Sequence, residues 1–376
     1  MSSYKLLDDL YKSFVKPILF KIDPEDIHDL LSFGSYFVTK NLNFTPKVKT
    51  FDFSSNVNGL EFQNVVGLAA GFDYDANWVK SMPFFGFGFN TVGTVTNMPY
   101  KGNPKPRLTR LIDSNSILVN KGFKSSGADF IRKRLLDFNL DEQNIGVSIG
   151  ASNNPSLDSV EKSINDICTS LEKFTDLDFV KYFELNISCP NIVSKDSFYT
   201  FENYKKLLLA IKPLNIRRPI FVKMPIDFEL ETLKRYISFS LEKNINTFIF
   251  SNLQKDRAAV ISKKDSEKIK NLKGNLSGGP SFNQSNMVIA SAKKEFSKNI
   301  NIIGCGGILS PQDAWQKIKL GANLVQLVTG FIFSGPFLPI EINTYISDKL
   351  RQTGMCFEDA VGIDADEFLK DNLVTH

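Results

Sequence analysis

The chain has 376 residues, of which 42% are hydrophobic and 23% are charged, so it can bury a large core and is not a disordered protein. Its formal net charge of +4, without a Lys- and Arg-rich run that contains aromatic residues, gives no support for a nucleic-acid partner. Four cysteines without CxxC spacing and only two histidines argue against a disulfide framework, structural zinc and a histidine-dependent hydrolase. This cysteine usage is typical of a reducing compartment.

Residues 1–45 are predicted to form a helical extension, separate from a domain formed by residues 46–376. Apolar residues within 6–19 follow a helical stripe that lysines surround. The Asp23-Pro24 pair is a helix-start signal, and a second amphipathic helix follows it. Two such helices with a basic fringe suit a bilayer surface, whereas the commoner alternative is a helical hairpin packed on its own domain.

No segment has the pattern of a signal peptide or a membrane-spanning helix. Residues 1–21 carry charges throughout and lack an apolar core segment, so we expect no cleavable signal peptide. Two long uncharged stretches, 81–100 and 320–340, are interrupted by glycines and prolines. They are better interpreted as buried strands with flanking turns.

Apolar runs alternate with helical patterns along the rest of the chain, which predicts an α/β fold, a (β/α)8 TIM barrel with the N-terminal two-helix extension. A doubly wound open sheet is the competing fold, but its Gly-x-Gly-x-x-Gly turn is missing after the first strand. The predicted strands are 65–70, 89–95, 145–149, 179–187, 220–224, 247–250, 302–303 and 324–328. The predicted helices between them are 125–136, 157–174, 201–211, 229–243, 283–296 and 311–320.

Polar and nucleophilic groups gather where the predicted strand 179–187 ends. Asn186, Ser188, Cys189 and Asn191 occupy this position. The active sites of parallel barrels lie at the carboxyl ends of the strands. The Cys189 thiol at this position can act as a base or nucleophile. The asparagines can hold a ligand rich in amide groups. The alternative is a buried cysteine that acts as a small hydrophobic residue before an ordinary turn.

Glycine-rich turns follow the seventh and eighth predicted strands, where barrels commonly bind phosphate through backbone N–H groups. The turns contain Gly304-Cys305-Gly306-Gly307 and Thr329-Gly330. In the fifth apolar run, Lys223 needs a partner because burial of an unpaired ammonium is costly. A delocalised anion such as a reduced flavin ring and an internal salt bridge are both compatible with this position.

Taken together, these motifs resemble the dihydroorotate dehydrogenase family, specifically its quinone-linked class 2, over nearly the whole chain. The resemblance is most specific in the segments 66–73, 86–96 and 102–110, and it continues through 276–278 and 306–307. It implies FMN as cofactor, dihydroorotate or a related small molecule as substrate, and a quinone as electron acceptor. It also implies that the N-terminal helices form the mouth for the quinone and make peripheral contact with a membrane.

Carried over by position, the resemblance implies two catalytic residues. Cys189 falls at the position of the base, and Lys223 would stabilise the anionic reduced flavin. No metal is implied. The cofactor-binding positions are Ala69, Ala70, Gly71, Thr94, Ser148, Asn186, Lys223, Ser251, Gly278, Gly306, Gly307, Val328, Thr329 and Gly330. The substrate-binding positions are Asn191, Asn252, Lys121, Gly122, Phe123 and Tyr74, and the positions near the quinone are His28 and Arg110.

Several positions depart from the class 2 pattern. The base is normally Ser, and Cys is typical of class 1. Ser148, Val119 and Leu253 replace the family's Asn, Asn and Thr. Tyr74 replaces a Lys that would pair with the substrate carboxylate, an interaction worth ~1.5–3 kcal/mol. We hypothesise that Lys121, beside Gly122 and Phe123 in the predicted substrate loop, replaces that charge, whereas the alternative is that Lys121 faces solvent.

Two other functions stay open at this stage. One is an FMN oxidoreductase of the same fold that acts on a different dihydropyrimidine, cyclic amide or enone. The other is a non-catalytic, membrane-linked barrel scaffold. The expected location is peripheral and monotopic on a membrane, facing a reducing compartment such as the cytoplasm or, in a eukaryote, at the mitochondrial inner membrane.

Overall fold

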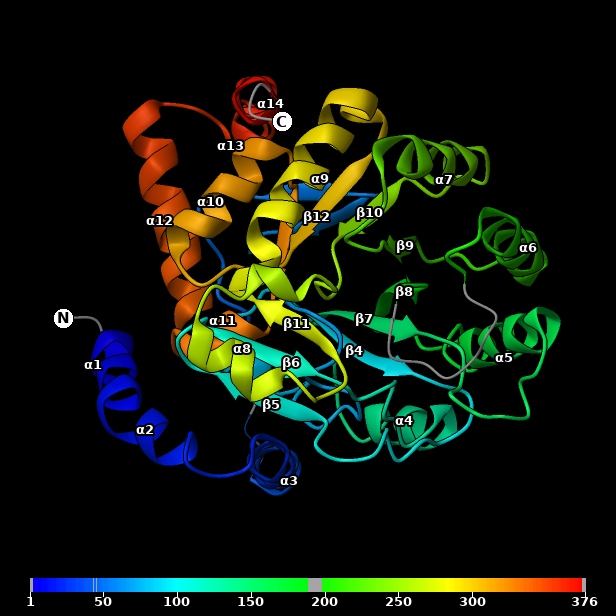
Figure 1. Cartoon of the computed structure of the whole chain (residues 1–376), viewed down its shortest axis with the longest axis horizontal. Coiled ribbons are helices and arrows are strands. Elements are labelled where there is room, and N and C mark those ends of the chain that lie inside the picture. The colour runs from blue at the N-terminus through cyan, green and yellow to red at the C-terminus, as the bar shows by residue number, and fades with distance from the viewer. Residues whose placement is uncertain (1–2, 43, 45, 189–197, 374–376) are drawn as a thin grey trace.

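A closed barrel of eight parallel strands forms the centre of the computed structural model, which describes residues 3–42, 44, 46–188 and 198–373 (Figure 1). These strands confirm the predicted TIM barrel, since each overlaps one predicted run. Around the barrel they are β3 (Val66–Leu68), β4 (Phe89–Val95), β7 (Asn144–Ile149), β8 (Val180–Asn186), β9 (Ile220–Lys223), β10 (Thr247–Phe250), β12 (Asn301–Cys305) and β13 (Leu324–Leu327).

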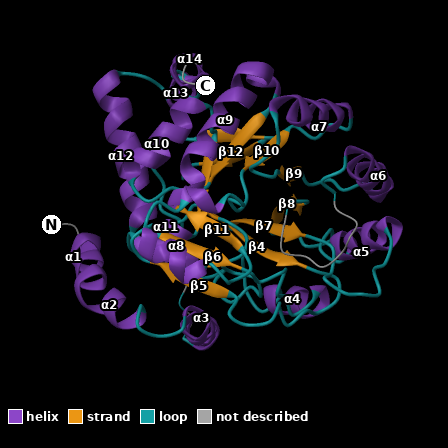
Figure 2. Cartoon of the chain, in the orientation of Figure 1, coloured by secondary structure: helices purple, strands orange, loops and turns teal. Residues whose placement is uncertain are grey.

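Helices surround the barrel because each has one apolar stripe that it buries against the strands (Figure 2). In α5, for example, Ile164, Ile167 and Leu171 recur at helical spacing and are buried. The six predicted helices correspond to α4 (Ala128–Leu135), α5 (Val160–Glu172), α6 (Phe201–Ile211), α7 (Leu230–Glu242), α9 (Phe282–Phe296) and α10 (Pro311–Leu320). The chain continues after β13 through α11 (Thr329–Phe333), α12 (Leu338–Thr353), α13 (Phe357–Ala360) and α14 (Ala365–Leu373).

A small antiparallel sheet, which the sequence pattern did not predict, lies beside the barrel mouth. It consists of β5 (Leu108–Leu111), β6 (Ser116–Val119) and β11 (Asn275–Gly278), in the order β11-β6-β5. With α8 (Lys263–Ile269) it encloses its own apolar cluster. A separate hairpin, β1 (Ser55–Val57) and β2 (Leu60–Phe62), precedes the barrel.

The N-terminal extension is present, and its first helix is interrupted. It runs as α1 (Ser3–Leu10), a π-helical turn (Tyr11–Val15) and α2 (Lys16–Leu19), followed by α3 (Pro24–Asn41). The predicted cap is confirmed, because the Asp23 carboxylate accepts hydrogen bonds from two backbone N–H groups in the first turn of α3. The division into domains at residue 45 stays a prediction.

The extension is held to the barrel by polar contacts and exposes apolar side chains on its other faces. The Tyr11 hydroxyl donates to the Ile332 carbonyl at 2.8 Å, and Lys16 Nζ donates to the Phe333 carbonyl at 2.6 Å. Phe14 and Phe33 are 66% and 68% exposed. Within the described ranges, no helix is both long and apolar enough to cross a membrane.

Candidate active site

A cavity of about 440 Å³ extends from the N-terminal helices into the barrel mouth. Val15, Leu19 and Leu31 line it at the helical end. Asn186 and Lys223, at the carboxyl ends of β8 and β9, line it at the barrel end. A small molecule at the barrel mouth can therefore be reached from the apolar surface of the extension.

A second hollow of about 80 Å³ lies beside the first, at the ends of β10, β12 and β13. Gly306 and Gly307 have φ values of +113° and +76°, in the region that favours glycine. A Cβ on Gly307 would lie 2.5 Å from the Phe282 Cβ, so the close approach of the two backbones requires glycine. The predicted cofactor residues that line this hollow are Ala69, Ala70, Lys223, Ser251, Gly278, Gly306, Gly307, Val328, Thr329 and Gly330.

Small residues line the two hollows where they adjoin. Ala69 and Ala70 follow β3, and Gly71 has a φ of +106° with nothing within 4 Å of the position that a Cβ would take. Gly71 and Thr94 line the larger cavity. This open space fits the flat ring of the FMN that the resemblance implies, and the glycine-rich hollow fits its phosphate.

A chain of hydrogen bonds connects the strand ends at the mouth. Asn186 Nδ2 donates to Thr94 Oγ1 at 2.8 Å, and Thr94 Oγ1 lies 3.1 Å from Ser148 Oγ. Asn252 Nδ2 donates to Ser188 Oγ at 2.7 Å. Asn186, Thr94 and Asn252 line the larger cavity, whereas Ser148 is fully buried behind Thr94 and lines neither hollow.

Lys223 has an internal carboxylate within reach. Its side chain is 5% exposed, and Nζ lies 3.9 Å from Glu184 Oε1. Lys223 also lines both hollows. The salt bridge considered from the sequence therefore exists, and the same ammonium faces the space where a cofactor ring fits.

Lys121, Gly122 and Phe123, in the predicted substrate loop, line the larger cavity together with Tyr74. The Tyr74 ring stacks on the His28 ring of α3, with the ring centres 5.2 Å apart. Phe123 has a φ of +62°, which is uncommon for an aromatic residue and indicates local strain. Lys121 Nζ lies 4.3 Å from the centre of the Tyr74 ring. Burial and the neighbouring Lys124 charge lower the pKa of Lys121 to about 8. Lys121 lines the cavity, and its replacement of the missing charge stays a prediction.

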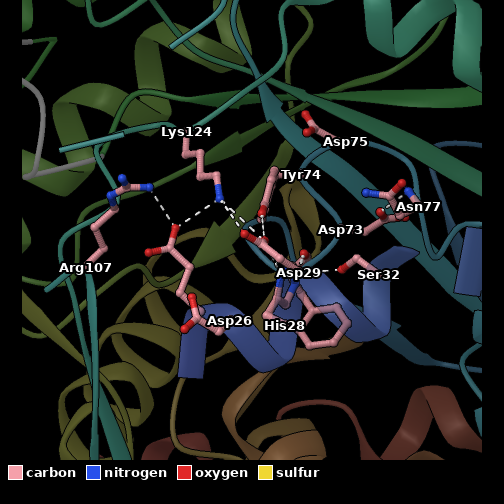
Figure 3. Close-up of polar contacts among 12 residues, drawn as sticks. Asp26, His28, Asp29, Ser32, Asp73, Tyr74, Asp75, Asn77, Arg107 and Lys124 are labelled. Atoms are coloured by element: carbon pink, nitrogen blue, oxygen red, sulfur yellow. Dashed lines mark hydrogen bonds and ion pairs between the residues drawn. The ribbon is translucent and has the colours of Figure 1, made fainter. Parts of the chain in front are cut away.

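Charged residues of α3 contact this loop directly (Figure 3). The Tyr74 hydroxyl donates to Asp29 Oδ1 at 2.6 Å, and Lys124 Nζ lies 3.2 Å from Asp29 Oδ2. Lys124 and Arg107 also pair with Glu25, at 3.0 and 2.8 Å. The neighbouring His28 ring, whose Nδ1 lies 3.6 Å from Asp29 Oδ1, and the hydrogen bonds from Tyr74 and Lys124 hold the pKa of Asp29 well below its usual range. The extension and the predicted substrate loop are thus one connected polar network.

The two residues predicted near the quinone line the same cavity. His28 Nε2 lies 2.8 Å from the Phe72 carbonyl oxygen, which can only accept, so this nitrogen carries the proton. Burial lowers the pKa of His28. The Arg110 guanidinium donates to the Ile22 carbonyl at 2.7 Å and lies 4.7 Å from the centre of the Phe20 ring.

Two predicted site residues lie outside the part of the chain that the structure describes, and three residues in or near the site were not predicted. Cys189 and Asn191 lie outside the described residues. Sequence reasoning missed Glu184, although a glutamate two residues before Asn186 on an apolar strand points to the same face and is a signal. It also missed Asp29 and Lys124, whose contacts join distant parts of the chain.

Across the residues with described placement, no group of three or more His, Cys, Asp or Glu side chains could hold a metal ion.

The fold and the two hollows define a TIM-barrel protein whose mouth fits a nucleotide-like cofactor and opens toward an apolar helical extension. The sequence model of the family described as "Dihydroorotate dehydrogenase" matches residues 53–350. The chain belongs to the dihydroorotate dehydrogenase family.

Relatives named "Dihydroorotate dehydrogenase (quinone)" match most of the chain. The one from Christiangramia forsetii is 36% identical over 352 residues, which are 90% of this chain and 99% of the relative. The one from Brucella anthropi is 32% identical and covers 93% of this chain and 94% of its own. The ligand-free DHODH structure from Eimeria tenella superposes with a TM-score of 0.79 at 26% identity, over 91% of this chain and 99% of the other.

Proposed function

We propose that this protein oxidises dihydroorotate to orotate with FMN and passes the electrons to a quinone. The observation that carries the proposal is the continuous cavity, which has Lys223 and Asn186 at one end and His28 and Arg110 at the other. The names of the relatives above, which include the word quinone, support the same activity.

FMN would lie with its ring against Ala70, Gly71 and Thr94 and its phosphate at the turns that contain Gly307 and Gly330. When bound, FMN supplies the acceptor for the two electrons of the oxidation. The Lys223 ammonium provides positive charge in a site with little water, where it stabilises developing negative charge strongly.

The substrate would lie at the barrel end of the larger cavity. Asn186 and Asn252 provide amide groups that match the amides of a dihydropyrimidine. Lys121 would pair with the substrate carboxylate in place of the charge that Tyr74 does not provide. Cys189 would remove the proton from C5 of the substrate.

The quinone would enter between the N-terminal helices and pass near His28 and Arg110. The exposed apolar residues of α1, α2 and α3 support peripheral attachment to a membrane, because burial of exposed apolar area in the interface is favourable. The proposal also places the protein on a membrane that faces a reducing compartment such as the cytoplasm or, in a eukaryote, at the mitochondrial inner membrane.

A second candidate is an FMN oxidoreductase that acts on a different cyclic substrate. It is favoured by the replacement of polar family positions with Val119 and Leu253, which both line the cavity. This wall accommodates a less polar ring than that of dihydroorotate.

Purification of the full chain followed by anaerobic addition of substrates separates these possibilities. The first proposal predicts a yellow protein whose flavin is bleached by dihydroorotate. A flavin that dihydroorotate does not bleach, but that another dihydropyrimidine or an alternative cyclic compound does bleach, supports the second candidate. Protein that binds no FMN contradicts both and favours the scaffold.

A further inference from the structure

Glu184 is a buried carboxylate in the interior of the barrel. It lies on β8, and its side chain is 0% exposed. Oε1 accepts a hydrogen bond from Ser148 Oγ at 2.8 Å. Oε2 is also buried and has no hydrogen-bond partner among the described residues. Because an unpartnered buried carboxylate oxygen is costly, Glu184 requires an explanation beyond packing.

Glu184 lies deeper in the barrel than the residues that line the proposed FMN site. It precedes Asn186 by two residues on the same strand, so both side chains point into the barrel and Glu184 lies one layer deeper. Glu184 lines neither hollow, whereas Lys223, whose Nζ is 3.9 Å from Oε1, lines both. The carboxylate is therefore behind the ammonium when viewed from the cavity.

Two kinds of contact connect Glu184 to residues at the mouth. The first is electrostatic, because a pair this far from solvent is weakly screened. The second is the hydrogen-bond chain that runs from Glu184 through Ser148 and Thr94 to Asn186. Glu184 thus acts on both Lys223 and Asn186 without touching either cavity.

We propose that Glu184 is a positioning residue that partly neutralises the Lys223 ammonium behind the FMN site and thereby lowers the reduction potential of the flavin. Reduction adds negative charge to the ring, and a nearby carboxylate opposes that charge while an ammonium favours it. The inference rests on the proposed function, because it requires FMN at the mouth.

Glu184→Gln is the direct test, since it keeps an oxygen acceptor for Ser148 and removes the charge. We expect the equilibrium constant for two-electron reduction of bound FMN to rise at least tenfold, which corresponds to about +30 mV. Dye-coupled redox titration of the FMN-loaded full chain measures this shift. Asp265→Asn is the matched control, because Asp265 is also buried and also accepts from a serine hydroxyl at 2.8 Å, from Ser114. An unchanged potential in Glu184→Gln overturns the proposal.

A second variant changes the potential in the opposite direction. Ser148→Ala removes the hydroxyl that donates to Glu184, which leaves the carboxylate charge less compensated. We expect the potential to fall in this variant. If Glu184→Gln does not fold, this result alone decides the proposal, and a rise or no change contradicts it.

A third measurement does not depend on FMN. A double-mutant cycle of Glu184→Gln and Lys223→Met, followed by denaturant unfolding of the full chain, isolates their coupling. We expect the unfolding equilibrium constant of the double variant to differ at least threefold from the product of the single effects. Additive effects contradict the pairing. If the wild-type chain binds no FMN, the proposed function and the effect on potential both fail, and the cycle still decides the pairing.

Discussion

The proposed FMN site, which spans the two hollows, and the proposed substrate site are built differently. The wall proposed for FMN consists of small residues and glycines with positive φ, such as Gly71 and Gly307, and their positions follow the family motifs. The substrate end departs from those motifs at Tyr74, where a network with α3 replaces the expected lysine. A backbone-lined cofactor site leaves little room for substitution, whereas a side-chain-lined substrate site can exchange its charges. Removal of single groups in each of the two sites tests this contrast.

The largest effect is expected at Lys223. Lys223→Met removes the ammonium from a buried position beside both hollows, so stabilisation of developing negative charge is lost. We expect the rate of flavin reduction by substrate to fall ~10²–10³-fold, as for loss of one preorganised charge-stabilising group. Anaerobic stopped-flow absorbance measures that rate. A rate within twofold of wild type would show that Lys223 is not part of the chemistry.

The cofactor wall should be intolerant of a single methyl group. Gly307→Ala combines a φ of +76° with a Cβ only 2.5 Å from Phe282, so the turn must shift and FMN retention should drop. Gly354→Ala is the control, because Gly354 has a φ of +69° and open space around the added Cβ. It should cost only the backbone strain of ~1–2 kcal/mol. Bound FMN per chain measures cofactor retention in the two variants, and the unfolding midpoint measures their loss of stability. Equal FMN content in Gly307→Ala and Gly354→Ala contradicts the account.

At the substrate end, Lys121→Ala should raise the KM for dihydroorotate by about tenfold or more, from the loss of ~1.5–3 kcal/mol of charge-assisted binding. Because the pKa of Lys121 is lowered to about 8, its ammonium is lost as the pH rises through that value. Wild-type affinity should therefore weaken above about pH 8, and the variant should lack this dependence. Initial rates at several pH values provide the measurement. An unchanged KM would assign the carboxylate to another residue.

The smallest effect is expected for Tyr74→Phe. It removes the hydroxyl that donates to Asp29 at 2.6 Å and keeps the ring beneath Lys121. We expect a loss of ~1 kcal/mol or more in the free energy of unfolding, together with a higher KM for the quinone. Denaturant unfolding and steady-state rates with a short-chain quinone measure these changes. A changed KM for substrate alone would contradict an effect of this hydrogen bond on the quinone site.

The sequence predicted the features that local patterns determine. Alternating apolar runs located all eight strands, and the Asp23-Pro24 pair located the start of α3. The sheet that pairs β6 with β11 was missed, because its strands are short and join residues 116–119 to 275–278. The pairing of Lys124 with Asp29 likewise depends on folding that brings α3 to the mouth. Ser148 was predicted at the cofactor, and only the packed barrel shows that it lies behind Thr94.

The central claim is that one cavity connects a substrate site at the barrel mouth to a quinone site between the N-terminal helices. The most direct test is anaerobic addition of dihydroorotate to the flavin-loaded full chain, followed by a short-chain quinone, with flavin absorbance recorded throughout. The account predicts bleaching in the first step and recovery of the oxidised spectrum in the second. A flavin that dihydroorotate does not bleach, or that stays reduced when quinone is added, would contradict it.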